Sequence, residues 1–121
     1  MRIFSIIVFL IIFIGCSSDG MHKGILPRER MQLVVFDLIK VDEFINNYVI
    51  KDSTVDIKKK RSILYEQVFK VHKTSRDQFF SSYKYYQQNP KLQKELFDSL
   101  QQLITRKTTA AAKADSARKT P

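Results

Sequence analysis

Glycine and cysteine are scarce in this chain, and their scarcity removes several classes of active site. Of 121 residues, three are glycine and one is cysteine. A phosphate-binding loop and a nucleophile elbow both depend on glycines at fixed spacing, and neither pattern occurs. A single cysteine cannot form an intramolecular disulfide, so the fold depends on packing alone. We therefore expect a protein that is not an enzyme and that has no cofactor.

A hydrophobic run long enough to cross a membrane is also missing. The apolar stretch near the amino terminus covers residues 3–14, whereas a transmembrane helix needs about 20 apolar residues. Arg2 precedes the stretch, and Gly15 ends it directly before Cys16. A basic residue, a short apolar segment and a small residue at the cleavage point are typical of a secretory signal peptide.

The end of this stretch suggests a lipid anchor. Phe13-Ile14-Gly15-Cys16 resembles the bacterial lipobox, in which the cysteine thiol receives a diacylglyceryl group and becomes the new amino terminus. The resemblance implies that residues 1–15 are a signal peptide and that Cys16 carries the lipid. The alternatives are an uncleaved anchor with a bystander cysteine, and a cleaved signal without a lipid. Lipidation would attach the mature chain to the bacterial envelope, and we expect the outer membrane, on its periplasmic or surface face.

Acidic residues are outnumbered by basic ones. The chain has 21 Lys and Arg against 12 Asp and Glu, which gives a formal net charge of +9. Removal of residues 1–15 takes away Arg2 and no acid, so the mature chain carries +8. A secreted domain of this charge is attracted to anionic lipids, acidic glycans or acidic proteins. Export argues against a nucleic-acid partner, and no small-molecule substrate is indicated.

Beyond the signal, the pattern predicts an all-α fold: a small bundle of about four helices. Residues 16–24 form a polar tether, 25–106 the helical domain, and 107–121 a disordered tail without large apolar residues. The first helix is apolar over a wide arc and is expected to be central. Apolar spacing of three and four predicts inner faces of Met31, Val34, Val35, Leu38, Val41, Ile45, Tyr48 and Val49, then Ile57, Leu64, Tyr65, Val68 and Val71, then Phe79, Phe80, Tyr83 and Tyr86, and finally Leu92, Leu96, Leu100, Leu103 and Ile104.

Three polar residues are predicted to have structural roles. Asp42 falls between apolar positions of the first helix, so a partly buried carboxylate there needs a partner, from Arg61, Arg76 or a tyrosine hydroxyl. A structural ion pair is favoured over a catalytic carboxylate. Ser75 and Gln78 have the spacing of a capping box, in which each side chain bonds the backbone N–H of the other residue.

The two histidines do not predict a metal site. His22 lies in the tether and His72 at the end of the second helix, without further ligands at a suitable spacing. A cationic ring at a helix end, where it meets the negative pole, is the favoured interpretation for His72.

Two groups of surface residues are candidates for partner binding. The first is a run of four cations at the start of the second helix, Lys58, Lys59, Lys60 and Arg61. These residues either touch an anionic lipid or form a solvated charged face. The second is the pair Lys84 and Tyr85, predicted to point away from the core, as a contact for a partner or glycan or as ordinary surface.

Several segments together resemble a known family. They are the lipobox, "ILPRERM" from Ile25, "FDLIKVDEF" from Phe36, and "LYEQVFKVHKTSRDQFFSSYKYYQQNP" from Leu64. This layout resembles small envelope lipoproteins catalogued as domain of unknown function number four-two-nine-six. The resemblance implies a helical lipoprotein and no established activity. It also implies a glycine and an aliphatic residue where this chain has Lys73 and Thr74.

Two functions from different classes follow. The first is a non-catalytic accessory lipoprotein that binds an envelope protein through a helical face. The second is a binder of anionic lipid or glycan through the basic surface. Attraction between charges weakens with added salt, whereas an apolar contact does not, so salt dependence separates the two.

Overall fold

The chain folds from helices alone over its described length, as the apolar spacing predicts. The computed structural model describes residues 22–119. In chain order its elements are α2 (Arg28–Asn47), the 3-10 helix η1 (Val49–Lys51), α3 (Ile57–Val71), α4 (Arg76–Gln88) and α5 (Pro90–Lys119). No strand occurs between residues 22 and 119, so the all-α class is confirmed. The predicted signal peptide and Cys16 lie outside the described residues.

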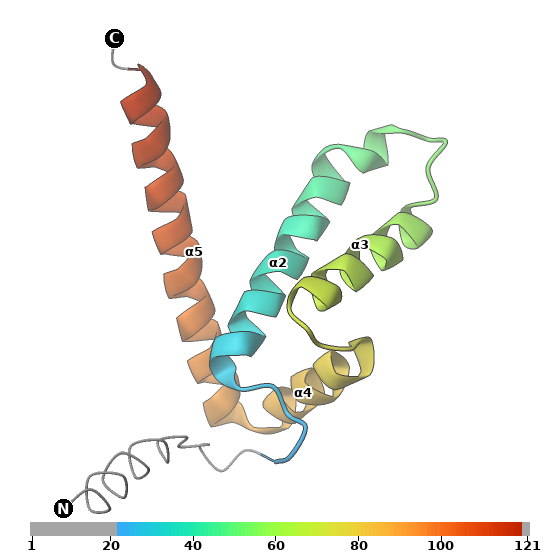
Figure 1. Cartoon of the computed structure of the whole chain (residues 1–121), viewed down its shortest axis with the longest axis vertical. Coiled ribbons are helices and arrows are strands. Elements are labelled where there is room, and N and C mark those ends of the chain that lie inside the picture. Colours follow the sequence, from blue (N-terminus) through green and yellow to red (C-terminus); the bar gives the residue numbers. More distant parts are fainter. Residues whose placement is uncertain (1–21, 120–121) are drawn as a thin grey trace, which may run out of the picture.

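The central helix is α2, with α3 on one side and α5 on the other (Figure 1). The shorter α4 crosses below the start of α2 and links the lower ends of α3 and α5. From this end α2 and α5 run upward and diverge, so their second halves are well separated in Figure 1. The described chain enters the bundle beside α4, and α5 ends far from that point. The predicted central position of the first helix is therefore correct.

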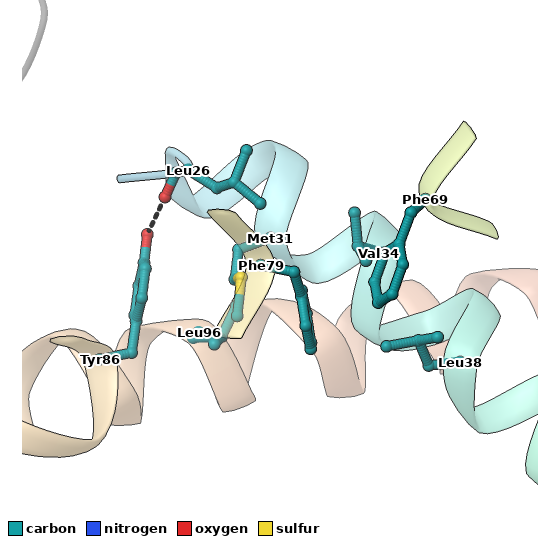
Figure 2. Packing of buried hydrophobic residues seen from close by; sticks show 8 residues of the cluster. All are labelled: Leu26, Met31, Val34, Leu38, Phe69, Phe79, Tyr86 and Leu96. Atoms are coloured by element: carbon teal, nitrogen blue, oxygen red, sulfur yellow. Dashed lines mark hydrogen bonds between the residues drawn. The ribbon is translucent and has the colours of Figure 1, made fainter. Parts of the chain in front are cut away.

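The core lies near α4, where the four α-helices meet the entry segment, which is formed by residues 22–27 before α2. Its side chains interdigitate in Figure 2, and they are Leu26, Met31, Val34, Leu38, Phe69, Phe79, Tyr86 and Leu96. Helices in a small bundle are stabilised mainly by this kind of apolar burial. Further buried positions continue along α2, η1 and α5, at Ile45, Val49, Leu100 and Leu103.

Leu26 closes the core at the point where the chain enters. Its N–H donates to Ser82 Oγ (2.8 Å), and its carbonyl accepts from the Tyr86 hydroxyl (3.1 Å; Figure 2). Buried backbone groups need such partners, because an unpaired one loses its bonds to water without replacement. Two side chains of α4 thus hold the entry segment in place. The sequence pattern assigns this segment to no helix.

Four predicted inner positions are wrong, each for a local reason. Ile104 is 38% exposed because α5 has diverged from α2 at this point (Figure 1). Tyr48 is 68% exposed because α2 ends at Asn47 and the helical spacing stops there. Val71 is 73% exposed because it is the last residue of α3, where the chain turns away toward α4. Phe80 is half exposed because the buried face of α4 centres on Phe79, and adjacent residues lie about 100° apart around a helix.

The predicted disordered tail is also wrong. Helix α5 continues without a break to Lys119, so residues 107–119 are helical. Every residue from 104 to 119 is exposed, in keeping with the lack of large apolar residues after Ile104. Alanine supplies the helix propensity, with residues 110–112 all alanine. An ion pair one turn apart, from Lys119 to Asp115 (2.8 Å), adds local support.

Candidate functional site

Asp42 has the structural role predicted for it, in a half-exposed position. Its Oδ1 accepts from Arg61 Nε (3.0 Å), and its Oδ2 accepts from the Tyr65 hydroxyl (2.9 Å). Burial and the Asp42 carboxylate raise the pKa of the Tyr65 hydroxyl, because ionisation there would bring a second negative charge beside the first. The carboxylate therefore joins α2 to α3, and both oxygens are occupied by structural partners.

Ser75 caps α4 as predicted, but Gln78 does not complete the capping box. The Gln78 N–H donates to Ser75 Oγ (3.1 Å). The Gln78 side chain turns elsewhere: its Oε1 accepts from the Thr74 hydroxyl (2.8 Å) and its Nε2 donates to the Gly24 carbonyl (3.3 Å). The reciprocal bond is absent because Gln78 instead ties the entry segment to the turn before α4.

That turn is a Schellman motif closed by a lysine. Thr74 N–H donates to the Phe69 carbonyl (3.0 Å) and Lys73 N–H to the Lys70 carbonyl (3.1 Å), the two bonds that define the motif. Lys73 has φ of +50°, a left-handed conformation that glycine adopts most easily. This is the position at which the family resemblance implies glycine.

Arg30 and His72 join the end of α3 to α2. Arg30 donates to the backbone carbonyls of His72 (2.6 Å) and Lys73 (3.3 Å), which are free acceptors at a helix end. The His72 ring lies against Asp37, with Nε2 2.6 Å from Oδ2. Among residues 22–119 no group of three or more ligand side chains gathers that could hold a metal ion.

The four-cation run divides into two parts. Lys58, Lys59 and Lys60 are exposed in the first turn of α3, whereas Arg61 turns inward to its bond with Asp42. Asp56, which the sequence analysis overlooked, caps this helix by accepting from Lys59 N–H (3.1 Å). The three lysines lie at the upper end of α3, away from the entry of the chain (Figure 1).

Of the two residues predicted to form a partner contact, Lys84 and Tyr85, only Lys84 is exposed. Lys84 is exposed, but Tyr85 is partly buried against the core. The ring of His22 lies edge-on to Tyr85, with 5.2 Å between ring centroids. Tyr85 therefore holds the entry segment, which leaves Lys84 alone at the surface.

The divergence of α2 and α5 leaves a groove of about 410 Å³ between them. Its α2 wall presents Phe36 and Ile39, and its α5 wall presents Ile104 and Ala111. Ile39 and Ile104 are exposed, although both are large and apolar. Charged and polar residues border these apolar ones, namely Lys40, Glu43, Lys107 and Thr108. The sequence analysis missed the groove, because it joins residues more than 60 positions apart.

A larger hollow of about 570 Å³ is less suited to binding. All its lining residues come from α5, and they are polar or charged: Asp98, Gln101, Gln102, Thr105 and Arg106. A hollow bordered by one helix has no opposing wall to enclose a ligand. The groove between α2 and α5 is thus the candidate interaction surface.

The fold, a helical bundle with an open groove between α2 and α5, defines a small all-α protein. Within the described part of the chain, no helix combines the length and apolar character needed to span a membrane. Residues 23–110 match the family described as "Domain of unknown function (DUF4296)". The match covers most of the 121 residues, and the chain belongs to this family. No curated protein and no solved structure matches the chain significantly.

Proposed function

We propose that this protein is a lipid-anchored accessory subunit of the bacterial envelope, which binds another envelope protein through α2 and α5. The observation that supports this proposal is the groove between these helices, where Ile39 and Ile104 are exposed and Phe36 is partly exposed. Exposed apolar residues with a polar border are typical of protein interaction sites. Helix-in-groove docking is a common mode of recognition.

The lipid anchor is supported by the amino-terminal sequence. A short apolar run ends at Gly15-Cys16 with the spacing of a lipobox. A lipid on Cys16 would place the entry segment and α4 nearest to the membrane. The groove and the second half of α5 would then face away from it (Figure 1). In this orientation they would meet a partner that extends into the periplasm or beyond the surface.

A second candidate function is the binding of anionic lipid or glycan. It is favoured by Lys58, Lys59 and Lys60, which are exposed at one end of α3. These lysines lie at the end opposite the chain entry, so they would not reach the membrane that holds the anchor (Figure 1). An anionic glycan, or a second membrane, fits this position better.

Two measurements test the proposal. Mass spectrometry of the amino-terminal peptide should show a chain that begins at a diacylated Cys16. An unmodified Cys16 in a chain that still begins at Met1 would exclude the anchor. For the partner, a photoreactive amino acid at Ile104 should cross-link an envelope protein in intact cells, and one at Phe80, also exposed but on α4, should not. Cross-linking that is equal at both positions would contradict the groove as the binding surface.

Salt dependence decides between the two functions. The Ile104 cross-link should be lost only in part when salt is raised, because the apolar part of the contact is little affected by screening. Two results together would favour the second function instead. Envelope binding would be lost entirely at high salt, and it would also be lost in the triple variant Lys58→Ala, Lys59→Ala and Lys60→Ala.

A further inference from the structure

We infer that the groove between α2 and α5 receives an acidic amphipathic helix of a partner protein, packed along the second half of α5. This inference rests on the proposed function and specifies the surface and the class of partner. It is carried by three features of residues 104–119: their exposure, their small side chains and their charge.

The second half of α5 is a helix without a partner in this chain. Residues 104–119 are exposed throughout, so tertiary packing does not hold this segment in shape. A helix of about 15 residues is marginally stable in water when it stands alone. Its support is local, from alanines and from bonds such as Thr108 Oγ to the Ile104 carbonyl (2.8 Å). A partner that packs on this segment would supply the tertiary contact that it lacks within residues 22–119.

The side of this segment that faces the groove is shaped for another helix. Ile104, Lys107 and Ala111 line it, and Arg118 lies two turns beyond Ala111 on the same face. Alanine leaves the backbone uncovered, so a second helix can approach to about 8 Å between axes. Ile39 and Phe36 on α2 provide the opposite apolar wall. A helix with one apolar face fits between these walls.

The charge of the segment selects an acidic partner. Between residues 104 and 119 the chain has five cations, Arg106, Lys107, Lys113, Arg118 and Lys119, against the single acid Asp115. Asp115 is engaged by Lys119 (2.8 Å). No acidic side chain within residues 22–119 pairs with the other four cations. A second copy of this chain would bring the same cations and be repelled, whereas a helix with Glu or Asp beside its apolar face would be attracted.

A membrane surface fits the same segment less well. Helices that lie in a membrane interface insert large apolar residues such as Trp, Phe and Leu. After Ile104 the segment has no apolar residue larger than alanine. The segment also projects away from the end at which the chain enters (Figure 1).

The test measures binding of a defined peptide to the purified full chain. The probe is a synthetic helical peptide of about 16 residues with leucines three and four apart and glutamates beside them. A matched probe has lysine in place of each glutamate. Fluorescence anisotropy should show at least ~10-fold tighter binding of the acidic peptide, since charges across an interface discriminate between partners.

Two double variants with the same change in net charge test the location. Lys107→Glu with Arg118→Glu reverses the groove side of α5, and Arg106→Glu with Lys113→Glu reverses the opposite side. The first pair should weaken binding of the acidic peptide by about 10-fold, and the second pair by less than about 3-fold. All four side chains are exposed, so both variants should keep the parent's circular dichroism.

Several outcomes would overturn the inference. Equal binding of the two peptides would show that charge does not select the partner. Equal loss in the two double variants would show attraction by net charge without a docked helix. Tight binding to vesicles of anionic phospholipid, with loss only in the groove-side variant and no peptide binding, would make a membrane the occupant. If the Ile104 cross-link forms in cells but the acidic peptide does not bind, the proposed function holds and this inference fails.

Discussion

At the residue scale, Lys73 occupies a position that suits glycine. Its φ of +50° costs a residue with a side chain about 1–2 kcal/mol. The Schellman bonds around it keep the turn in place despite this cost.

We expect Lys73→Gly to stabilise the fold by about 0.5–1 kcal/mol, because relief of the left-handed strain outweighs the greater freedom of glycine in the unfolded chain. Urea unfolding of the two proteins measures the difference. Lys84→Gly is the control, since Lys84 is exposed inside α4 and the change should cost about 1 kcal/mol there. A loss of stability in Lys73→Gly would show that the lysine side chain contributes more than its backbone costs.

Ser75, which follows this turn, contributes to stability as the cap of α4. Ser75→Ala removes the acceptor of the Gln78 N–H and should lower the free energy of unfolding by about 1 kcal/mol. Helix content in the native state should not change, because Phe79 and Tyr86 still pack in the core. Ser81→Ala is the matched control, an exposed serine inside α4. If the Ser75 variant unfolds at the same urea concentration as the parent, the cap does not contribute to stability.

Ionisation of the Tyr86 hydroxyl should lower the free energy of unfolding at alkaline pH. Burial raises the pKa of its hydroxyl from 10.0 to about 12, because the ionised form would lose hydration in the core. The folded state therefore binds its proton more tightly than the unfolded state does. Stability from this group is complete below pH 10 and should fall as the pH rises from 10 toward 12.

Urea unfolding at a series of pH values should show this fall in the parent protein. Tyr86→Phe should be less stable at neutral pH, because it lacks the donor to the Leu26 carbonyl, and should lose less stability between pH 10 and 12. Tyr48→Phe, at an exposed tyrosine, should keep the parent's profile. A Tyr86→Phe profile parallel to that of the parent would assign the alkaline fall to another group.

At the element scale, α5 combines two halves with different physical support. Its first half is held in the bundle by Leu96, Leu100 and Leu103. Its second half has no such contact and persists through helix propensity and bonds one turn apart. We therefore expect that this second half can be removed without unfolding the rest of the bundle.

Deletion of residues 109–121 should leave the melting temperature unchanged within error, because no side chain from 109 to 119 is buried. The helical circular dichroism of the whole chain should decrease, since residues 109–119 belong to α5. A tail that is disordered in solution would instead leave the helical signal constant. A large drop in melting temperature would show that the segment packs on the body.

At the scale of the whole molecule, the entry segment is attached to the bundle at several points. Leu26 is buried against α4 and α5, Gly24 is bonded by Gln78, and His22 lies on Tyr85. The chain therefore emerges beside α4 at a defined place. With a lipid on Cys16, this attachment would direct the groove and the cations of α5 away from the membrane.

Leu26→Ala tests how much the body depends on this segment. Removal of a buried leucine side chain should cost about 2–5 kcal/mol, because it loses apolar burial and leaves a cavity in the core. Leu33→Ala makes the same chemical change on the exposed side of α2 and should cost far less. Equal effects of the two variants in urea unfolding would show that the entry segment is not part of the cooperative core.

Short-range features of this protein were predictable from the sequence alone. The all-α class, the starts of α3 and α4 and the Ser75 cap follow from periodicity and capping. The need of Asp42 for a partner was also predictable, whereas the choice of Arg61 and Tyr65 was decided by the packing of α2 on α3. These features depend mostly on residues within a few turns of each other, and the spacing of apolar residues along a helix is visible in one dimension. The persistence of α5 to Lys119 was missed because the lack of large apolar residues was given more weight than the propensity of alanine.

Only the tertiary structure decided which side chains are buried and where a surface is left open. Ser82 is buried because it accepts from the N–H of Leu26, 56 positions away, and Gln78 turns to Gly24, 54 positions away. The groove exists because α2 and α5 touch near α4 and then diverge (Figure 1). Helix spacing specifies which face is apolar but contains no information on the angle between helices. That angle follows from how side chains of distant segments pack together.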